Sequence, residues 1–399
     1  MVEIPLPISG KKIAKTLSYN HVLLLKRADY VLRLLFLSWL GKFIRVLFVT
    51  SNPARLVNPR RVLVIRPGGI GDAVILVPVL KKLRSSFPQA HIAVLAERRN
   101  AAVFRPLCGN IIDALFCYDR FRDFLSLLVC SFDVVIDTEQ WHVLSAITAS
   151  TVGRKAIRIG FATNERSMFF THPVPYDNDG FEGDNFFRLL RPLDIDSTPP
   201  YPFACFYPVD RFSRQDKAKR VALFPGASIK ERQWDPAKFR EVAAWLRSRN
   251  IDVVIVGGRE DVESSKIIAS GLNDVENLAG RTSLEETAGV LASCDLVVAS
   301  DSGIMHLAVA VGTPVVAFFG PGIESKWAPR DGISIVINKK FPCSPCTSFG
   351  YTAACSRNAQ CIQEITVDEV LNAIKSILFR EWELGTGEWE LRRHEHKKY

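Results

Sequence analysis

The chain contains 399 residues, of which 48% are hydrophobic and 23% are charged. These proportions are ordinary for a globular protein and argue against long disorder, collagen-like repeats and a polytopic membrane protein. The formal net charge is +9, but residues 1–61 alone contain eleven Lys or Arg and two acidic residues. A basic excess confined to one segment gives no ground for a nucleic-acid partner, and we expect none.

The basic N-terminal segment, residues 1–58, contains a very apolar region at residues 21–49. Its longest uncharged stretch, residues 34–41, is far shorter than the ~20 residues that span a bilayer. On a helical wheel the charges occupy one side, which predicts an amphipathic helix lying in the interface of an anionic membrane. The alternative is a helix packed on the back of the first domain, with snorkelling basic side chains. No signal peptide is evident, so we expect the cytoplasm.

Alternating strand and helix patterns follow. Short β-branched runs predict buried strands at residues 62–65, 92–95, 133–137, 221–224, 252–256, 296–300 and 315–319. Apolar periodicity predicts helices after residue 72, from about residue 143, from Pro236 behind an Asp235 N-cap, and over residues 367–379. Such alternation indicates parallel βαβ units and doubly wound sheets.

A stretch rich in Pro, Asp and Tyr, residues 173–208, is the best candidate boundary between two α/β domains. We therefore expect domains over residues 60–205 and 215–380, with a tail at 381–399. Two such halves imply a cleft between them. Ligands of doubly wound sheets bind at the carboxyl ends of the strands.

Two common nucleotide signatures can be tested directly. The Walker A pattern is absent. The loop from Gly68 to Gly71 resembles a dinucleotide fingerprint, but its third Gly position holds Val74. An enzyme that uses NAD is therefore disfavoured.

Stronger candidates stand at the strand ends of the second half. Asp301, Ser302 and Gly303 follow one strand and open a helix that contains His306. Free N–H groups at a helix start bind anions, and a diphosphate is a natural ligand there. The alternative is Asp301 as a helix N-cap, with His306 packed inward.

A second loop, residues 225–228, precedes two cations, Lys230 and Arg232, which can reach a phosphate in the same cleft. The alternative is a solvated run of charges.

Asp72 ends the glycine loop of the first half and starts a helix, so it faces the cleft from the opposite side. A carboxylate there can take a proton from a substrate hydroxyl. The alternative is again a helix N-cap, which would make it a weaker base.

Together these motifs resemble glycosyltransferase family 9, the ADP-heptose:lipopolysaccharide heptosyltransferases. The resemblance covers about residues 60–375 and rests on the order of the segments 62–73, 133–137, 224–228, 232–234, 256–258, 277–280, 300–306, 312–314 and 319–321. It implies a GT-B fold, with two Rossmann-like domains and the active site between them. It also implies a nucleotide-diphosphate heptose donor, held by the second half, and inversion at the anomeric carbon without an obligatory metal or other cofactor.

Site roles follow from the matching positions. Asp72 would be the general base that activates the acceptor hydroxyl. The donor would be held by Ser228, Lys230, Arg232, Gly257, Asp301, Ser302, Gly303, His306 and Gly320. The basic position two before Trp234 is usually Lys in this family, and here it is Arg232, so Lys230 is a second candidate for the phosphate-binding cation.

In the first half, Gly69, Glu139 and Gln140 are candidates to bind the acceptor. A glycolipid or glycan acceptor would give the N-terminal segment a purpose, because it would hold the cleft at the inner face of the bacterial cytoplasmic membrane.

Four cysteines form a C-x2-C-x8-C-x5-C pattern: Cys343, Cys346, Cys355 and Cys361. Four thiols this close in sequence can enclose a structural Zn or Fe. A similar loop occurs in many members of the family, and it holds iron in a subgroup that modifies autotransporter proteins. Free thiols in a connecting loop are the alternative.

The leading hypothesis is thus an inverting glycosyltransferase that transfers heptose from ADP-heptose to a lipopolysaccharide core or a related glycan. A sugar-nucleotide 2-epimerase of GT-B fold is one alternative. A non-catalytic glycan-binding protein is another, although the acidic residues at positions 72 and 301 argue against it.

Overall fold

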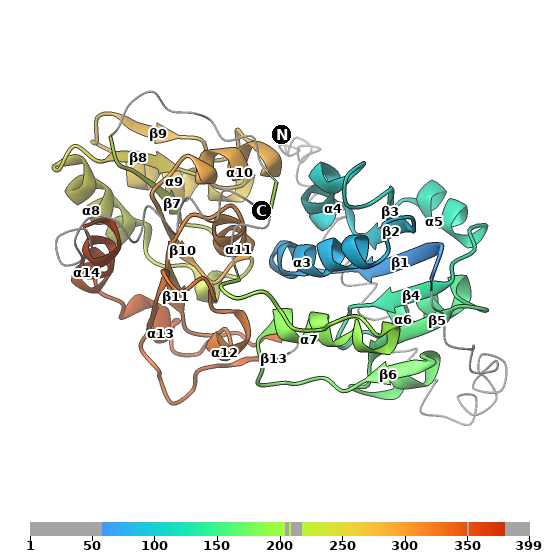
Figure 1. Cartoon of the computed structure of the whole chain (residues 1–399). Coiled ribbons are helices and arrows are strands. Elements are labelled where there is room, and N and C mark those ends of the chain that lie inside the picture. The colour runs from blue at the N-terminus through green and yellow to red at the C-terminus, as the bar shows by residue number, and fades with distance from the viewer. Residues whose placement is uncertain (1–57, 204–206, 209–217, 349–350, 380–399) are drawn as a thin grey trace, which may run out of the picture.

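The computed structural model describes residues 58–203, 207–208, 218–348 and 351–379. The predicted membrane segment before Asn58 and the tail at 381–399 lie outside the described residues. Two α/β halves stand side by side, each built on a six-stranded parallel sheet (Figure 1).

The first sheet has the strand order β3-β2-β1-β4-β5-β6. Its strands are β1 (Arg61–Arg66), β2 (His91–Ala96), β3 (Ala114–Cys117), β4 (Val134–Asp137), β5 (Ile157–Phe161) and β6 (His172–Val174). Its helices are α3 (Ile70–Ser86), α4 (Arg98–Phe104), α5 (Phe121–Leu128), α6 (Val143–Val152) and α7 (Glu182–Arg188).

The second sheet repeats this topology in the order β12-β11-β10-β7-β8-β9. Its strands are β7 (Arg220–Phe224), β8 (Asp252–Ile255), β9 (Val275–Asn277), β10 (Leu296–Ser300), β11 (Val315–Phe319) and β12 (Ile335–Asn338). Its helices are α8 (Pro236–Arg247), α9 (Val262–Ala269), α10 (Leu284–Ala292), α11 (Gly303–Ala310), α12 (Glu324–Trp327), α13 (Gln360–Gln363) and α14 (Val367–Leu378). A short hairpin, β13 (Thr347–Ser348) with β14 (Tyr351–Thr352), lies in the cysteine loop.

The central strands are continuous apolar runs because helices cover both faces of each sheet. In β1 five of six residues are buried, and Val62 stands in register with Ile92 of β2 and Val134 of β4. All seven strands predicted from the sequence are present, as is the N-cap of α8 by Asp235.

The candidate boundary, residues 173–208, contains a short helix, α7. Its sequence, EGDNFFR, is too short and too polar to show a helical period. Tertiary packing stabilises it instead, since Phe186 and Phe187 are both buried in the core.

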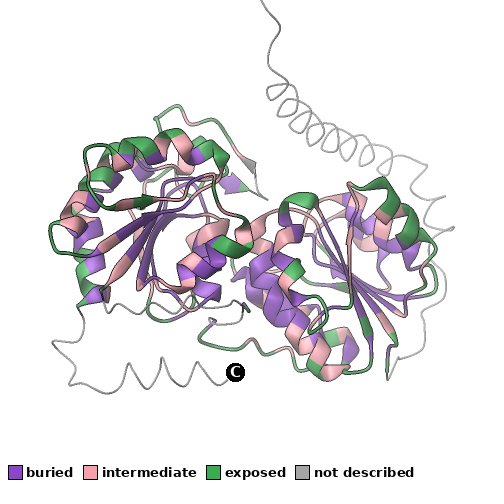
Figure 2. Ribbon diagram, turned by 90° about the horizontal axis from the view of Figure 1, so that it is seen from above, coloured by how far each residue is buried: buried purple, intermediate pink, exposed green. Residues whose placement is uncertain are grey.

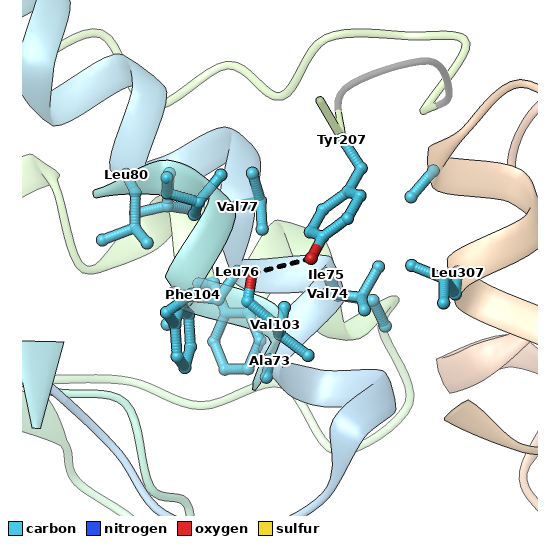
Figure 3. Packing of buried hydrophobic residues seen from close by; sticks show 14 of the residues in the cluster. Ala73, Val74, Ile75, Leu76, Val77, Leu80, Val103, Phe104, Tyr207 and Leu307 are labelled. Atoms are coloured by element: carbon cyan, nitrogen blue, oxygen red, sulfur yellow. Dashed lines mark hydrogen bonds between the residues drawn. The ribbon is translucent and has the colours of Figure 1, made fainter. Parts of the chain in front are cut away.

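The two halves meet where α3 packs against α11, and residues of both helices belong to one apolar cluster. Leu307 of α11 faces Val74 and Ile75 of α3 (Figure 3). Figure 2 shows that the helices at this junction are largely buried. The connecting chain adds polar links, because Tyr207 donates its hydroxyl to the Val103 carbonyl at 3.0 Å and its N–H to the Ala310 carbonyl at 2.9 Å. Within the described ranges, no helix is long and apolar enough to cross a bilayer.

Candidate active site between the two halves

The predicted site residues lie at the topological switch points of the two sheets. In each half the strand order reverses between the first and fourth strands, β1 and β4 in one and β7 and β10 in the other. Ligands of such sheets bind at the carboxyl ends of these two strands. Asp72 follows β1, Glu139 and Gln140 follow β4, Arg232 follows β7 and Asp301 follows β10.

The two switch points touch each other. A Cβ added to Gly71 would lie 2.7 Å from the Cδ2 atom of His306, and one added to Gly303 would lie 2.8 Å from the Cβ atom of Ile70. Only glycine permits this approach of the N-termini of α3 and α11. The acidic residue of each half, Asp72 or Asp301, is therefore brought to the same place.

Asp72 is the third residue of α3, and Gly69 is the N-cap, with no side-chain cap. The alternative of Asp72 as an N-cap is thus wrong. Its side chain is 23% exposed, and its Oδ2 atom lies 3.9 Å from the Nη2 atom of Arg66. The carboxylate is reachable by a substrate and faces a fixed cation.

Arg66, the last residue of β1, is that cation, and it is buried. Its guanidinium donates to the carbonyl oxygens of Pro67 at 2.6 Å and Thr138 at 3.0 Å, and to Glu139 at 3.3 Å. Burial acts to lower the pKa of Arg66, but the Asp72 and Glu139 carboxylates more than offset it and raise the pKa. Glu139 therefore positions Arg66, the arginine that faces the Asp72 carboxylate.

A second buried carboxyl, Glu182 of α7, stands beside this group. It accepts from Gln140 at 2.5 Å and from the Tyr176 hydroxyl at 2.7 Å. Lys326 of α12 reaches it from the second half, with Nζ 3.7 Å from Oε2, and also donates to the Asn178 carbonyl at 3.0 Å. Burial first, and then the charge of the nearby Asp72, raise the pKa of Glu182.

A deeper ion pair supports the loop after β4. Arg166 contacts Asp137 at 2.5 Å, and both side chains are fully buried. Arg166 also donates to the Glu139 carbonyl oxygen. This pair holds the chain that carries Glu139 and Gln140.

In the second half, Ser302 is the N-cap of α11 and accepts the Met305 N–H at 3.4 Å. Asp301 as the N-cap is therefore wrong as well. Asp301 is buried and forms an ion pair with Arg232, with Oδ2 3.0 Å from Nη1. Burial raises the pKa of Asp301, and Arg232 opposes that rise. A Cβ on Gly322 would lie 2.0 Å from this oxygen, so Gly322 leaves room for the carboxylate.

Of the two candidate cations, Arg232 is the one that lies in the site. It also donates to the Thr347 hydroxyl at 3.2 Å, and its buried Nε has no hydrogen-bond partner among the described residues. Lys230 and Ser228 are exposed. His306 is buried beside these groups, and burial together with the charge of Arg232 lowers its pKa to about 4.

Two predicted glycines face other parts of the second half. A Cβ on Gly257 would lie 2.8 Å from the Asp261 side chain, and one on Gly226 would lie 2.4 Å from its Oδ1. Asp261, which the sequence reading missed, thus lies between the ends of β7 and β8. A Cβ on Gly320 would lie 2.8 Å from the Cys361 sulfur, so this glycine packs against the cysteine loop.

The cysteine loop is joined to the turn that follows β11. The N–H groups of Cys346 and Thr347 donate to the Pro321 carbonyl at 3.1 and 2.9 Å. Burial first, and then the charges of the other three thiols, raise the pKa of Cys361 to about 11. The thiols are thus near one another, yet no three His, Cys, Asp or Glu side chains within the described ranges are grouped as metal ligands.

A hollow between the halves adjoins the site. Its lining includes Ile75, Phe181 and Phe203 on one side and His306, Val309 and Arg330 on the other. Side chains of both halves therefore contribute to one space.

The sequence did not identify four members of this group: Arg66, Tyr176, Glu182 and Lys326. For Arg66 a signal existed, because a charged residue at the end of a buried strand needs a partner. The other three come from elements whose proximity to Asp72 only the tertiary structure reveals.

Two Rossmann-ordered halves with their switch points in contact define the GT-B class of fold. The sequence profile of "Glycosyltransferase family 9 (heptosyltransferase)" matches residues 120–355. The chain therefore belongs to glycosyltransferase family 9 and is a glycosyltransferase enzyme.

Relatives and solved structures agree with this assignment. Lipopolysaccharide heptosyltransferase 3 of Escherichia coli is 27% identical over 290 residues, which cover 65% of this chain and 83% of the relative. The glycosyl transferase family 9 structure from Veillonella parvula covers 83% of this chain and 100% of its own, with a TM-score of 0.67 and 19% identity. The E. coli heptosyltransferase WaaC with ADP covers 79% and 99%, with a TM-score of 0.65 and 18% identity. Both structures share the fold of this chain.

Proposed function

We propose that this enzyme transfers heptose from ADP-heptose, with inversion, to a lipopolysaccharide core or a related glycan. The family and the names of the relatives support the heptosyl donor and the acceptor class. The observation that carries the proposal is the contact of the two switch points, Gly71 against His306 and Gly303 against Ile70. It supports a single reaction centre to which each half contributes one part.

The first half, residues 60–205, would bind the acceptor and activate its hydroxyl. Asp72 takes the hydroxyl proton as the acceptor oxygen forms its bond to the anomeric carbon. Arg66, 3.9 Å away, places a fixed positive charge beside the Asp72 carboxylate. Gly69 would leave space beside the carboxylate, and Gln140, whose amide nitrogen donates to Glu182, would offer its amide oxygen to an acceptor hydroxyl. Glu139 acts by holding Arg66 in place.

The second half, residues 215–380, would bind the donor. The bond from the anomeric carbon to the diphosphate oxygen breaks, and negative charge develops on the leaving group. Arg232 and the free N–H groups of Gly303 and its neighbours offset that charge. Ser302 contributes its hydroxyl to the same helix start.

The other donor-side residues have narrower roles. Asp301 orients Arg232 and can accept from a sugar hydroxyl. His306, neutral at pH 7, can donate one hydrogen bond without adding charge. Ser228, Lys230 and Gly257 would contact the nucleotide from the loops after β7 and β8, and Gly320 shapes the turn that leads to Gly322.

Thermal unfolding with a panel of nucleotides tests the donor. A ligand at 100 times its dissociation constant adds about 2.7 kcal/mol to the stability of the folded state. We expect ADP and ADP-heptose to stabilise the full-length protein, and UDP, GDP and CDP to have no effect. A preference for UDP or GDP would overturn the heptose donor, and no response to any nucleotide would favour a glycan-binding protein.

Product analysis tests the reaction. We expect a new glycoside with the anomeric configuration opposite to that of the donor when a core oligosaccharide acceptor is supplied. Formation of a new sugar nucleotide in the absence of acceptor would instead favour the epimerase.

We also propose that the enzyme works at the inner face of the bacterial cytoplasmic membrane, drawn there by the basic and apolar residues before Asn58. A glycolipid acceptor is anchored in that membrane, so membrane attachment would raise its local concentration. Flotation with anionic vesicles tests this, and an enzyme that stays entirely in the aqueous fraction would contradict it.

A structural Zn or Fe on Cys343, Cys346, Cys355 and Cys361 is a separate proposal, supported by the proximity of the thiols. As they lie, the four sulfurs do not form a ligand set, so we assign the metal no part in the reaction. Elemental analysis of the purified enzyme tests it. About one Zn or Fe per chain is expected, and traces alone would show free thiols.

A further inference from the structure

Helix α5 carries an apolar stripe on its exposed side. Eight large hydrophobic side chains are exposed among the described residues, and four of them lie on or directly after this one helix. Phe121 is 76% exposed and Val129 is 87% exposed, with Leu125 and Leu128 between them. Their spacing of four, seven and eight residues places them on one helical face.

The opposite face of α5 is anchored in the protein. Leu127 is fully buried, and Asp123 accepts the Cys117 N–H at 3.0 Å. The helix is therefore held with its apolar stripe outward, at the outer end of the first sheet (Figure 1). A contiguous exposed apolar patch of this kind marks an interaction site.

Basic residues border the stripe. Arg120 and Arg122 flank Phe121. Arg105 is also nearby, because its charge and that of Arg120 both act to lower the pKa of the Cys117 thiol. All three arginines are exposed, and none has an ion-pair partner within the described ranges. The acids beside them are held in other contacts: Asp119 pairs with Arg98 at 3.4 Å, Glu97 pairs with Arg99, and Asp123 accepts the Cys117 N–H.

We propose that the α5 stripe and its bordering arginines form a docking surface for an anionic lipid membrane. Apolar side chains ringed by cations are the pattern of interfacial membrane helices. Charge favours lipid over the other occupants. The N-terminal segment is itself strongly basic, and a second copy would present the same arginines, so either would bring like charges together.

The position of α5 fits this partner. Asp133 accepts the N–H groups of Arg60 and Arg61 at 2.7 and 2.9 Å, so the start of the described chain lies beside the residues that follow Val129. The basic and apolar residues 21–49 end nine positions before Asn58. The α5 stripe therefore ends on the side of the first half where the described chain begins.

The opposite end of α5 lies toward the reaction centre. Phe121 starts α5 at the carboxyl edge of the first sheet, directly after β3. Asp72 follows β1 at the same edge, and two strand spacings, about 10 Å, separate β3 from β1. A bilayer on α5 would thus lie beside the edge at which a lipid-anchored acceptor must enter. The surface does not depend on which sugar is transferred.

Hydroxyl-radical footprinting of the full-length protein tests the proposal, because it reports the water accessibility of individual side chains. The probe is a vesicle of phosphatidylglycerol and phosphatidylethanolamine, which contains no glycolipid acceptor. We expect labelling of Phe121 and Leu125 to fall about tenfold on vesicle binding, while labelling of Ile267, 49% exposed on α9, stays unchanged. A Phe121→Ser, Val129→Ser double variant should bind these vesicles about tenfold more weakly, and Ile267→Ser should bind as the wild type does.

Three results would overturn the proposal. Unchanged labelling of Phe121 on vesicle-bound protein would mean that the N-terminal segment alone makes the contact. Weak labelling without vesicles at high dilution would mean that the chain covers its own stripe. Labelling that decreases as the protein concentration is raised, in the absence of lipid, would indicate that a second copy covers the stripe.

Discussion

The two halves share one strand order, yet they build their parts of the site differently. Around Asp72, the first half gathers three buried acidic or basic side chains. Arg66 pairs with Asp72 and Glu139, and Glu182 lies close enough for the charge of Asp72 to raise its pKa. Around Asp301, the second half uses one ion pair, a helix N-terminus and glycines. Under the proposed function, the carboxylate that activates a hydroxyl stands in a fixed field of charges, whereas the site for a diphosphate offers open N–H groups and one cation.

Removing the carboxylate of Asp72 should have the largest effect. We expect Asp72→Asn to lower kcat by about 10²- to 10⁴-fold, the usual contribution of a general base. Steady-state transfer to a core oligosaccharide measures it. Asp368→Asn, in the first turn of α14, is the matched control for a helix-start carboxylate. Equal activity of the two variants would remove Asp72 from the chemistry.

Breaking the contact between the halves comes next. Lys326→Met leaves Glu182 buried without its cation, which should lower the free energy of unfolding by about 3–5 kcal/mol. Urea denaturation measures it, and Glu182→Gln in the same chain should restore part of the loss. Lys266→Met, which removes an exposed pair with Glu263, should cost less than about 1 kcal/mol. Similar losses in the free energy of unfolding for the two lysine variants would mean that the buried Lys326–Glu182 pair does not stabilise the contact between the halves.

The neutral His306 should make stability depend on pH. Its pKa is lowered to about 4 by burial and Arg232, while the unfolded chain keeps the ordinary value of 6.5. Because the unfolded state then binds more protons, the free energy of unfolding should fall by about 3 kcal/mol as pH drops from 6.5 toward 4. His306→Gln should remove this part of the slope, and the exposed His91→Gln should not. The same slope in all three proteins would contradict the buried, neutral state.

The smallest effect should separate the two candidate cations. Arg232→Gln should weaken ADP-heptose binding by about ten- to a hundredfold, the worth of a charge-assisted hydrogen bond. Lys230→Gln, two residues earlier and exposed, should change the dissociation constant by less than about threefold. Isothermal titration calorimetry measures both. The reverse order would transfer the phosphate contact to Lys230 and return Arg232 to a purely structural pairing with Asp301.

The difference between the halves also explains what sequence could predict. In the second half, Asp301, Ser302 and Gly303 are consecutive, and the end of a predicted strand followed by the start of a helix identifies them. Arg232 lies two residues before the buried Trp234, inside the same short motif. Local sequence motifs of this kind can be recognised without knowledge of the tertiary structure.

The network of buried side chains around Asp72 is not local in the sequence. Glu182 and Lys326 are 144 positions apart and belong to different halves. Their pairing depends on how α7 and α12 meet across the junction. The hydrophobic periodicity of the sequence carries no information on that contact. Helix α7 itself was missed because its stability comes from burying Phe186 and Phe187 against α3 rather than from its own sequence.

A calorimetric titration of Asp72→Asn with ADP-heptose tests the division of labour between the halves most directly. If the first half performs the proton transfer and the second half binds the donor, the dissociation constant should stay within about threefold of the wild-type value. A dissociation constant about tenfold weaker or more would show that Asp72 belongs to donor binding, and the two halves would then not have separate roles.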